Sequence, residues 1–172
     1  PANGFTTLAQ TSTGSKSYPH DIAFSGNTAY VALNGSSKLW IMNAATLVKT
    51  GEIDLSAYTP AGASTPSVDR LWLDENTGRL FVSLERIVYA NYMPSIDYSS
   101  VIVIRTSDNT IEKEIKLQWD SNGSTVNALN PYSKFVYASS SAWEKGDGHA
   151  HLFILCAGLY NADYSDKKDG GI

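Results

Sequence analysis

The stretch Leu71-Trp72-Leu73-Asp74-Glu75-Asn76-Thr77-Gly78-Arg79-Leu80-Phe81-Val82-Ser83 decides the fold class. Two short runs of apolar and aromatic residues flank a segment, Asp74 to Gly78, whose residue types favour turns. The pattern predicts two antiparallel strands joined by a tight turn. Farther along, Val101 to Ile104 and Ile111 to Leu117 form two more short runs around a second turn segment. Together these segments predict a meander of four strands.

The same order of features occurs three times along the chain. One copy begins at His20-Asp21, the second at Asp69-Arg70, and a third at Asn127, which becomes irregular after Ala138. Repeated units of about 40 to 60 residues with this content indicate a propeller or a solenoid. No segment keeps the apolar spacing of a helix for three turns. We therefore predict an all-β fold, a β-propeller fragment of four-stranded antiparallel meander blades.

The repeats predict a single propeller arc over residues 1–172. Residues 1–17 are expected to hold the outer strand of a preceding blade, near Phe5 to Leu8, and a linker. Blades are expected at 18–58, at 66–118 and, irregular or incomplete, at 126–172. Propellers close a ring of typically four to eight blades, which this arc cannot do. We expect the remaining polypeptide, another subunit, or self-association through the open blade edges to complete it.

Apolar layers are expected between neighbouring blades, because the strands carry near-continuous apolar runs. The residues predicted to fill these layers are Phe24, Tyr30, Trp40, Ile41, Trp72, Phe81, Val103 and Phe135.

Composition favours an extracellular, cell-surface or periplasmic domain. Charged residues make up 17% of the chain, against a typical value of about 25%, and Ser, Thr, Asn and Tyr are abundant. The net charge of -4 and the absence of a Lys/Arg cluster disfavour nucleic-acid binding. No run approaches the length of a transmembrane helix. The single cysteine, Cys156, lies in an apolar run and is predicted to be a small buried hydrophobe.

Several stretches resemble the YVTN-type, lactonase-like β-propellers. They are Leu39 to Val48, Val101 to Ile111, Pro19 to Phe24 and Asp74 to Val82, within a similarity that extends from Tyr18 to Ala138. The resemblance implies the propeller fold. It implies less about activity, because the family includes surface-layer, adhesion-like and periplasmic proteins as well as lactonases, and a fold does not carry one function.

Propeller geometry predicts where binding residues gather. If the first strand of each meander lines a central channel, the segments that begin the three repeats surround one mouth of it. The loops between second and third strands open on the same face, and long irregular loops on a rigid scaffold are where binding residues concentrate. The alternative is that the loop tyrosines only cover hydrophobic edges. The candidate binding residues are His20, Asp69, Arg70, Asn127, Tyr92, Tyr98 and Trp143.

Motifs for catalysis, metals and cofactors are weak. Asp147, His149 and His151 could share a metal ion, but two ligands and a possible third are too few. The chain has no Gly-x-Ser-x-Gly elbow, no phosphate-binding loop and no haem-attachment motif. We predict no catalytic residue, no metal and no cofactor. Asn34 and Asn122 begin N-glycosylation sequons, which matter only in a source that glycosylates secreted proteins.

Three functions from different classes are compatible with the sequence. The first is a non-catalytic extracytoplasmic scaffold or binding module with a protein or glycan ligand on the long-loop face. The second is a lactonase-like hydrolase, for which His20, Asp21, Asp69 and Asn127 are the available residues at the channel mouth. The third is a carbohydrate-binding propeller, in which tyrosine and tryptophan rings of the long loops stack on sugars. The first explains the polar surface and the lack of catalytic motifs.

Overall fold

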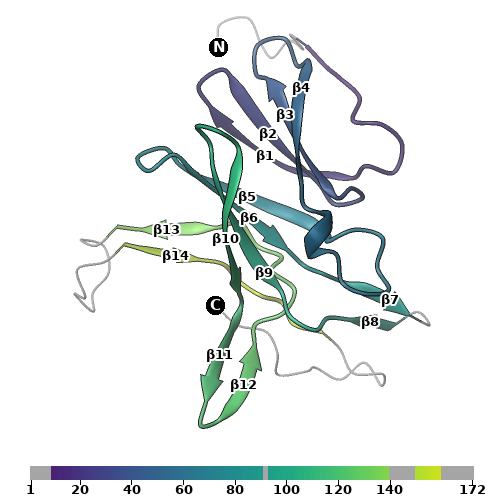
Figure 1. The fold of residues 1–172 in the computed structure, drawn as a ribbon, viewed down its shortest axis with the longest axis vertical. Helices are drawn as coiled ribbons and strands as arrows, with labels where there is room; N and C mark the ends of the chain where they lie inside the picture. The colour runs from purple at the N-terminus through teal and green to yellow at the C-terminus, as the bar shows by residue number, and fades with distance from the viewer. Residues whose placement is uncertain (1–8, 91–92, 140–149, 160–172) are drawn as a thin grey trace, which may run out of the picture.

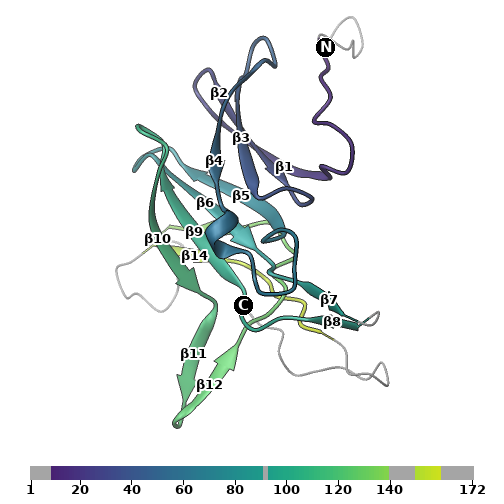
Figure 2. The same ribbon diagram turned by 45° about the vertical axis from the view of Figure 1, so that its right-hand side comes forward.

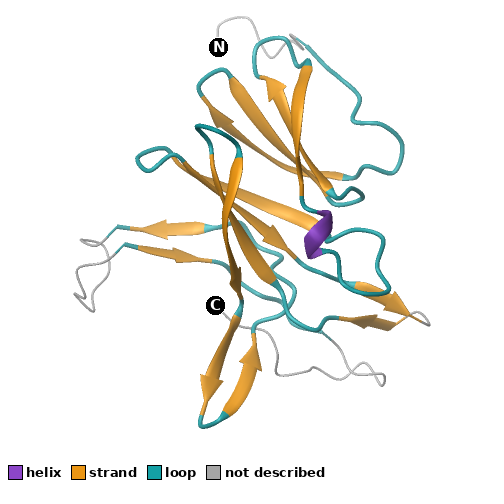
Figure 3. Ribbon diagram, viewed as in Figure 1, coloured by secondary structure: helices purple, strands orange, loops and turns teal. Residues whose placement is uncertain are grey.

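The computed structural model describes residues 9–90, 93–139 and 150–159. In these ranges the protein consists of β-strands and loops, with one short 3-10 turn at Ser56–Tyr58 (Figure 3). The main sheets are antiparallel four-stranded meanders and do not close into a barrel within the described residues. The predicted fold class is confirmed. The outer strand expected near Phe5 lies outside the described residues.

The first sheet contains four strands that follow one another in the chain and in space. They are β1 (Pro19–Ser25), β2 (Thr28–Leu33), β3 (Lys38–Asn43) and β4 (Lys49–Asp54). A two-residue turn joins β1 to β2, and its first residue, Gly26, has a φ of 56°. Glycine adopts this left-handed conformation without steric cost, so the sequence stabilises a tight hairpin here.

The second sheet is a meander with an insertion. Its strands are β5 (Val68–Asp74), β6 (Arg79–Leu84), β9 (Ser100–Arg105) and β10 (Thr110–Lys116). A hairpin of β7 (Val88–Ala90) and β8 (Met93–Ser95) interrupts the chain between β6 and β9, yet β6 and β9 still pair directly. The hairpin therefore extends away from the sheet as a loop elaboration (Figure 1).

Two smaller hairpins follow. β11 (Gln118–Ser121) and β12 (Ser124–Asn127) project from the body of the protein (Figures 1 and 2). Asn122 and Gly123 both have positive φ in their turn, as an Asn-Gly hairpin favours. β13 (Val136–Ala138) pairs with β14 (His151–Phe153), and a bridge joins Pro131 to Cys156. No helix in the described part of the chain has the length and apolar character needed to cross a bilayer.

A backbone contact recurs in all three repeats and fixes their alignment. In each repeat, two successive residues after the second strand donate their N–H groups to the two residues that precede the first strand. In the first repeat, Asn34 N donates to the Tyr18 carbonyl oxygen and Gly35 N to that of Ser17. The corresponding donor–acceptor pairs are Glu85–Ser67 and Arg86–Pro66 in the second repeat, and Ala157–Asn130 and Gly158–Leu129 in the third. The neighbouring strand pairs agree: Pro19 with Leu33, Val68 with Leu84, Pro131 with Cys156.

This alignment corrects the start of the third repeat. Its pairing begins at the bridge between Pro131 and Cys156 and continues in β13 and β14. Asn127, where the sequence pattern suggested a start, is the last residue of β12 and pairs with Gln118. The pattern misled because Ala128 and Leu129 are apolar and buried, as strand residues would be, although they precede the strand.

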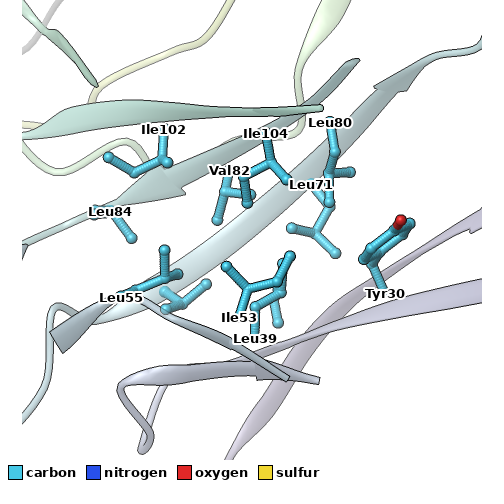
Figure 4. Packing of buried hydrophobic residues seen from close by; sticks show 12 residues of the cluster. Tyr30, Leu39, Ile53, Leu55, Leu71, Leu80, Val82, Leu84, Ile102 and Ile104 are labelled. Carbon is cyan, nitrogen blue, oxygen red and sulfur yellow. The ribbon is translucent and has the colours of Figure 1, made fainter. Parts of the chain in front are cut away.

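The core lies between the two four-stranded sheets (Figure 4). Tyr30 from the first sheet is 1% exposed, and its hydroxyl donates to Asn109 Oδ1 of the second sheet's last turn at 2.7 Å. Burying each large apolar side chain contributes about 1.5–3 kcal/mol, so this layer holds the sheets together. The buried residues of the cluster are Tyr30, Ala32, Leu39, Ile53, Leu55, Val68, Leu71, Leu80, Val82, Leu84, Ile102 and Ile104.

The predicted apolar layers are partly correct. Tyr30 and Val103 are buried, and Ile41 and Phe135 are half-buried against core clusters. Trp40, Trp72 and Phe81 are also half-buried. Trp72 contacts Phe81 and stacks on Tyr137 of the third repeat, with ring centroids 5.3 Å apart in both pairs.

Phe24 contradicts the prediction, because it is 51% exposed. Successive side chains of a strand point to opposite faces. Ala23 packs against the core between the two sheets, so Phe24 faces the other side of the first sheet. That face also carries a cluster formed by Ala29, Val31, Leu33 and Met42.

Candidate functional site

One end of the two main sheets gathers the segments that surround a candidate site. The residues before β1 and β5 lie beside the residues that follow β2 and β6, through the repeated backbone contact described above. Thr65 Oγ1 also donates to the Asn34 carbonyl oxygen at 3.0 Å, which joins the first repeat to the second. We call this end the loop face; it comprises residues 16–18, 34–37, 61–67, 85–90 and 93–99.

His20 and Asp69, which occupy equivalent positions in two repeats, are in direct contact. His20 Nδ1 lies 2.6 Å from Asp69 Oδ1, and the geometry is that of a ring N–H donating to a carboxylate. The His20 side chain is 35% exposed, whereas that of Asp69 is 1% exposed. The buried carboxylate therefore orients the partly exposed imidazole.

Arg70 connects all three repeats. Its Nη1 donates to the His20 carbonyl oxygen at 3.1 Å, and its Nε donates to the Tyr132 carbonyl oxygen at 3.4 Å. The same Nε lies 3.2 Å from Asp69 Oδ2, an ion pair that lacks hydrogen-bond geometry. The first strands thus converge on Arg70. Tyr132 takes the place in the third repeat that the sequence assigned to Asn127.

Asn34 and Glu85 belong to the same group of polar side chains, although sequence reasoning assigned neither to the site. Asn34 Nδ2 donates to Glu85 Oε2 at 3.3 Å and to the Val68 carbonyl oxygen at 3.4 Å. Each residue directly follows the last residue of the second strand in its repeat. We call His20, Asp69, Arg70, Asn34 and Glu85 the axial cluster.

Burial changes the acidity of the two carboxyl groups in the axial cluster. The pKa of Glu85 is raised to about 7, because burial and, to a smaller extent, the nearby Asp69 charge outweigh the lowering effect of the hydrogen bond from Asn34. Burial also raises the pKa of Asp69, while the hydrogen bond from His20 and the charge of Arg70 oppose the change. Near neutral pH Glu85 therefore carries a proton in part of the molecules.

A groove of about 380 Å³ opens beside the axial cluster on the loop face. Asn34 belongs to both, and the rings of Tyr18 and Tyr89 line the groove while staying 59% and 73% exposed. Gly35 forms part of the surface, and a Cβ atom there would collide with the Lys16 carbonyl oxygen and press on the Tyr18 ring. Only glycine allows the chain to approach this closely.

The groove is uncharged and rich in hydroxyl groups. Ser64, Thr65 and Ser67 line it together with Ala63 and Gly62. Among the described residues none that lines it carries a charge. Gly62, whose φ is 89°, brings this segment against Val88 of the β7–β8 hairpin, so the hairpin forms one wall. This combination suits a neutral, polar ligand.

Tyr98 has a different environment from the groove tyrosines. Its half-buried ring lies between Arg86 and Lys116, whose charged groups are 4.0 Å and 4.3 Å from the ring centroid. Arg86 is buried and donates to the carbonyl oxygens of Tyr98 and Tyr58 and to Asp97. These contacts hold the base of the β7–β8 insertion, and Tyr98 does not line the groove.

Four of the other residues singled out in the sequence lie outside the described residues. They are Tyr92, Trp143, and Asp147 and His149 of the weak metal motif. His151 is half-buried on β14, where its ring lies 6.0 Å from that of Phe153. Among the residues that the structure describes, no three His, Cys, Asp or Glu side chains are close enough to hold a metal ion together.

Cys156 is buried beside Ala128 and Ile154. Burial raises the pKa of its thiol to about 11. The thiol therefore stays protonated near neutral pH and packs as a small hydrophobe.

No family model matches the sequence, and no curated protein matches it. The function must therefore be inferred from the loop face itself.

Proposed function

We propose that this chain is a non-catalytic, extracytoplasmic binding module of the β-propeller type, which binds its ligand on the loop face. The observation that carries the proposal is the uncharged groove with two exposed tyrosine rings. Ligand sites are typically concave, with aromatic walls and a few fixed polar groups. The low charge content of the chain, 17%, and its hydroxyl-rich composition support the extracytoplasmic location.

We also propose that further blades extend the two main sheets into a ring or array, as the resemblance to YVTN-type propellers implies. On the second sheet, Leu71 and Leu73 pack against the core between the sheets. The repeat alignment equates them with Ile22 and Phe24, which are 45% and 51% exposed. A further blade, from the remaining polypeptide, another subunit or a second copy, would bury this face as the first sheet buries its equivalent.

The proposal predicts that a ligand changes the chemical environment of the groove backbone. Isotope-labelled protein should be titrated with neutral oligosaccharides, a proline-rich peptide, and small lactones. We expect at least one class to shift the amide signals of Gly35, Gly62 and Ala63 and to leave those of the projecting hairpin, such as Gly123, unchanged. If no class shifts the groove signals, the binding-module proposal is wrong.

A lactonase-like hydrolase is the second candidate, and one observation favours it. His20 donates through Nδ1 to the buried Asp69, which is how enzymes orient a histidine that acts as a general base through Nε2. Under the leading proposal we expect no turnover of γ- or δ-lactones by the wild-type chain. The hydrolase would replace the binding module as the proposed function if the wild-type chain hydrolysed a lactone, His20→Gln abolished this activity, and Tyr18→Ala and Tyr89→Ala left it intact.

A further inference from the structure

We propose that the ligand of the groove is a neutral carbohydrate, whose sugar rings stack on Tyr18 and Tyr89. This inference rests on the proposed function and adds the class of ligand. The rings of Tyr18 and Tyr89 are exposed to solvent at the groove, although aromatic side chains usually bury a large apolar area. A sugar ring offers a flat C–H face to an aromatic ring and hydroxyl groups at its edge.

The position of the Tyr18 ring is fixed by the backbone. Tyr18 has a φ of 45°, a conformation that is unusual for a bulky residue. Its carbonyl oxygen accepts from Asn34 N at 2.9 Å, and its ring lies against Gly35. Ser67 and Asn130, the equivalent residues of the other two repeats, also have positive φ (54° and 59°), so the repeated backbone contact sets this conformation. The backbone that carries the ring is thus held in place before a ligand arrives, which reduces the entropy lost on binding.

The polar groups of the groove match hydroxyl groups. Ser64 is exposed, and each hydroxyl group can both donate and accept. Asn34 uses its Nδ2 for Glu85 and Val68, so its Oδ1 stays available as an acceptor. Sugar hydroxyl groups also donate and accept, and therefore satisfy both kinds of partner.

A proline-rich peptide is the main competing ligand, because such peptides also bind aromatic grooves. Proline has no backbone N–H, so a proline-rich chain presents mostly acceptors. Such a peptide would cover Asn34 Oδ1 without giving it a donor, and an acceptor that loses water in this way weakens binding. A charged ligand is disfavoured because no charged side chain of the described residues lines the groove.

The test is calorimetric titration of the chain with maltohexaose, cellohexaose, chitohexaose, xylohexaose and mannohexaose, and with a deca-proline peptide. We expect one or more hexaoses to bind, and Tyr18→Ala and Tyr89→Ala each to weaken binding by about tenfold. Tyr89→Phe keeps the ring and should bind within about threefold of wild type. Trp119→Ala removes an exposed aromatic residue of the projecting hairpin, and should leave binding unchanged. Equal melting temperatures would show that the variants are folded.

Three outcomes overturn the inference in different ways. If deca-proline bound through the same two tyrosines and no hexaose bound, the binding-module proposal would stand and the carbohydrate proposal would be rejected. Hexaose binding that survives both tyrosine-to-alanine changes would place the sugar elsewhere. If neither class binds and no probe shifts the groove signals, the proposed function fails together with the inference.

Discussion

Replacement of Leu80 by alanine is expected to lower the free energy of unfolding by about 2–5 kcal/mol. Leu80 is 0% exposed on β6 and packs in the cluster between the two main sheets (Figure 4). The change removes buried apolar atoms and leaves a cavity. The strands around it cannot move to fill the cavity, because hydrogen bonds to their neighbours hold them in place. Urea denaturation followed by circular dichroism measures the loss as a shift of the midpoint at constant slope.

Phe24→Ala is the matched control for Leu80→Ala. It removes a larger side chain from the same kind of sheet, but Phe24 is 51% exposed on the opposite face. Surface substitutions usually change stability by about 0.5 kcal/mol or less. In the monomeric chain, a loss at Phe24 as large as the loss at Leu80 would contradict the packing described above.

Strand positions could be predicted because their signals are local. The inner strands combine a short apolar run with turn residues nearby, as at Gly26 and at Asp74 to Gly78, whereas β4 and β10 are mostly polar. Which face of the sheet packs against the core is not encoded locally, because it depends on how the sheets pack together. In β1 both faces carry apolar residues, Ile22 and Phe24 on one and Ala23 on the other, and an irregularity near Pro19 shifts the pairing with β2. The sequence therefore could not separate Ala23, which faces the core, from Phe24.

The candidate site could be predicted in part. His20, Asp69 and Arg70 were singled out because they begin the repeats, and the structure brings these three together. Glu85 and Asn34 carry a similar signal, since each follows the second strand of its repeat, but neither begins a repeat. The groove left no signal along the chain. Tyr18, Gly62 and Tyr89 lie in separate segments that meet only through tertiary packing.

The free energy of unfolding is expected to fall by roughly 3 kcal/mol between pH 5 and pH 8 because of Glu85. The pKa of Glu85 is about 7 in the folded protein and returns toward 4.5 in the unfolded chain. Between these values the folded state holds a proton that the unfolded state has released. The contribution is therefore fully present below about pH 4.5 and is lost as pH rises through 7. Asp69, His20 and Arg70 are the charged or titratable groups that act on Glu85.

Glu85→Gln isolates this effect, because glutamine keeps an acceptor for Asn34 and cannot ionise. The variant should match wild type within about 1 kcal/mol at pH 5 and exceed it by roughly 3 kcal/mol at pH 8, with a flatter dependence between. Glu75→Gln, which changes an exposed carboxylate in a turn, should keep the slope of wild type. The measurement is urea unfolding at several pH values. If Glu85→Gln retained the full slope, the proton would belong to another group, and the burial of an ionisable Glu85 would not be the cause.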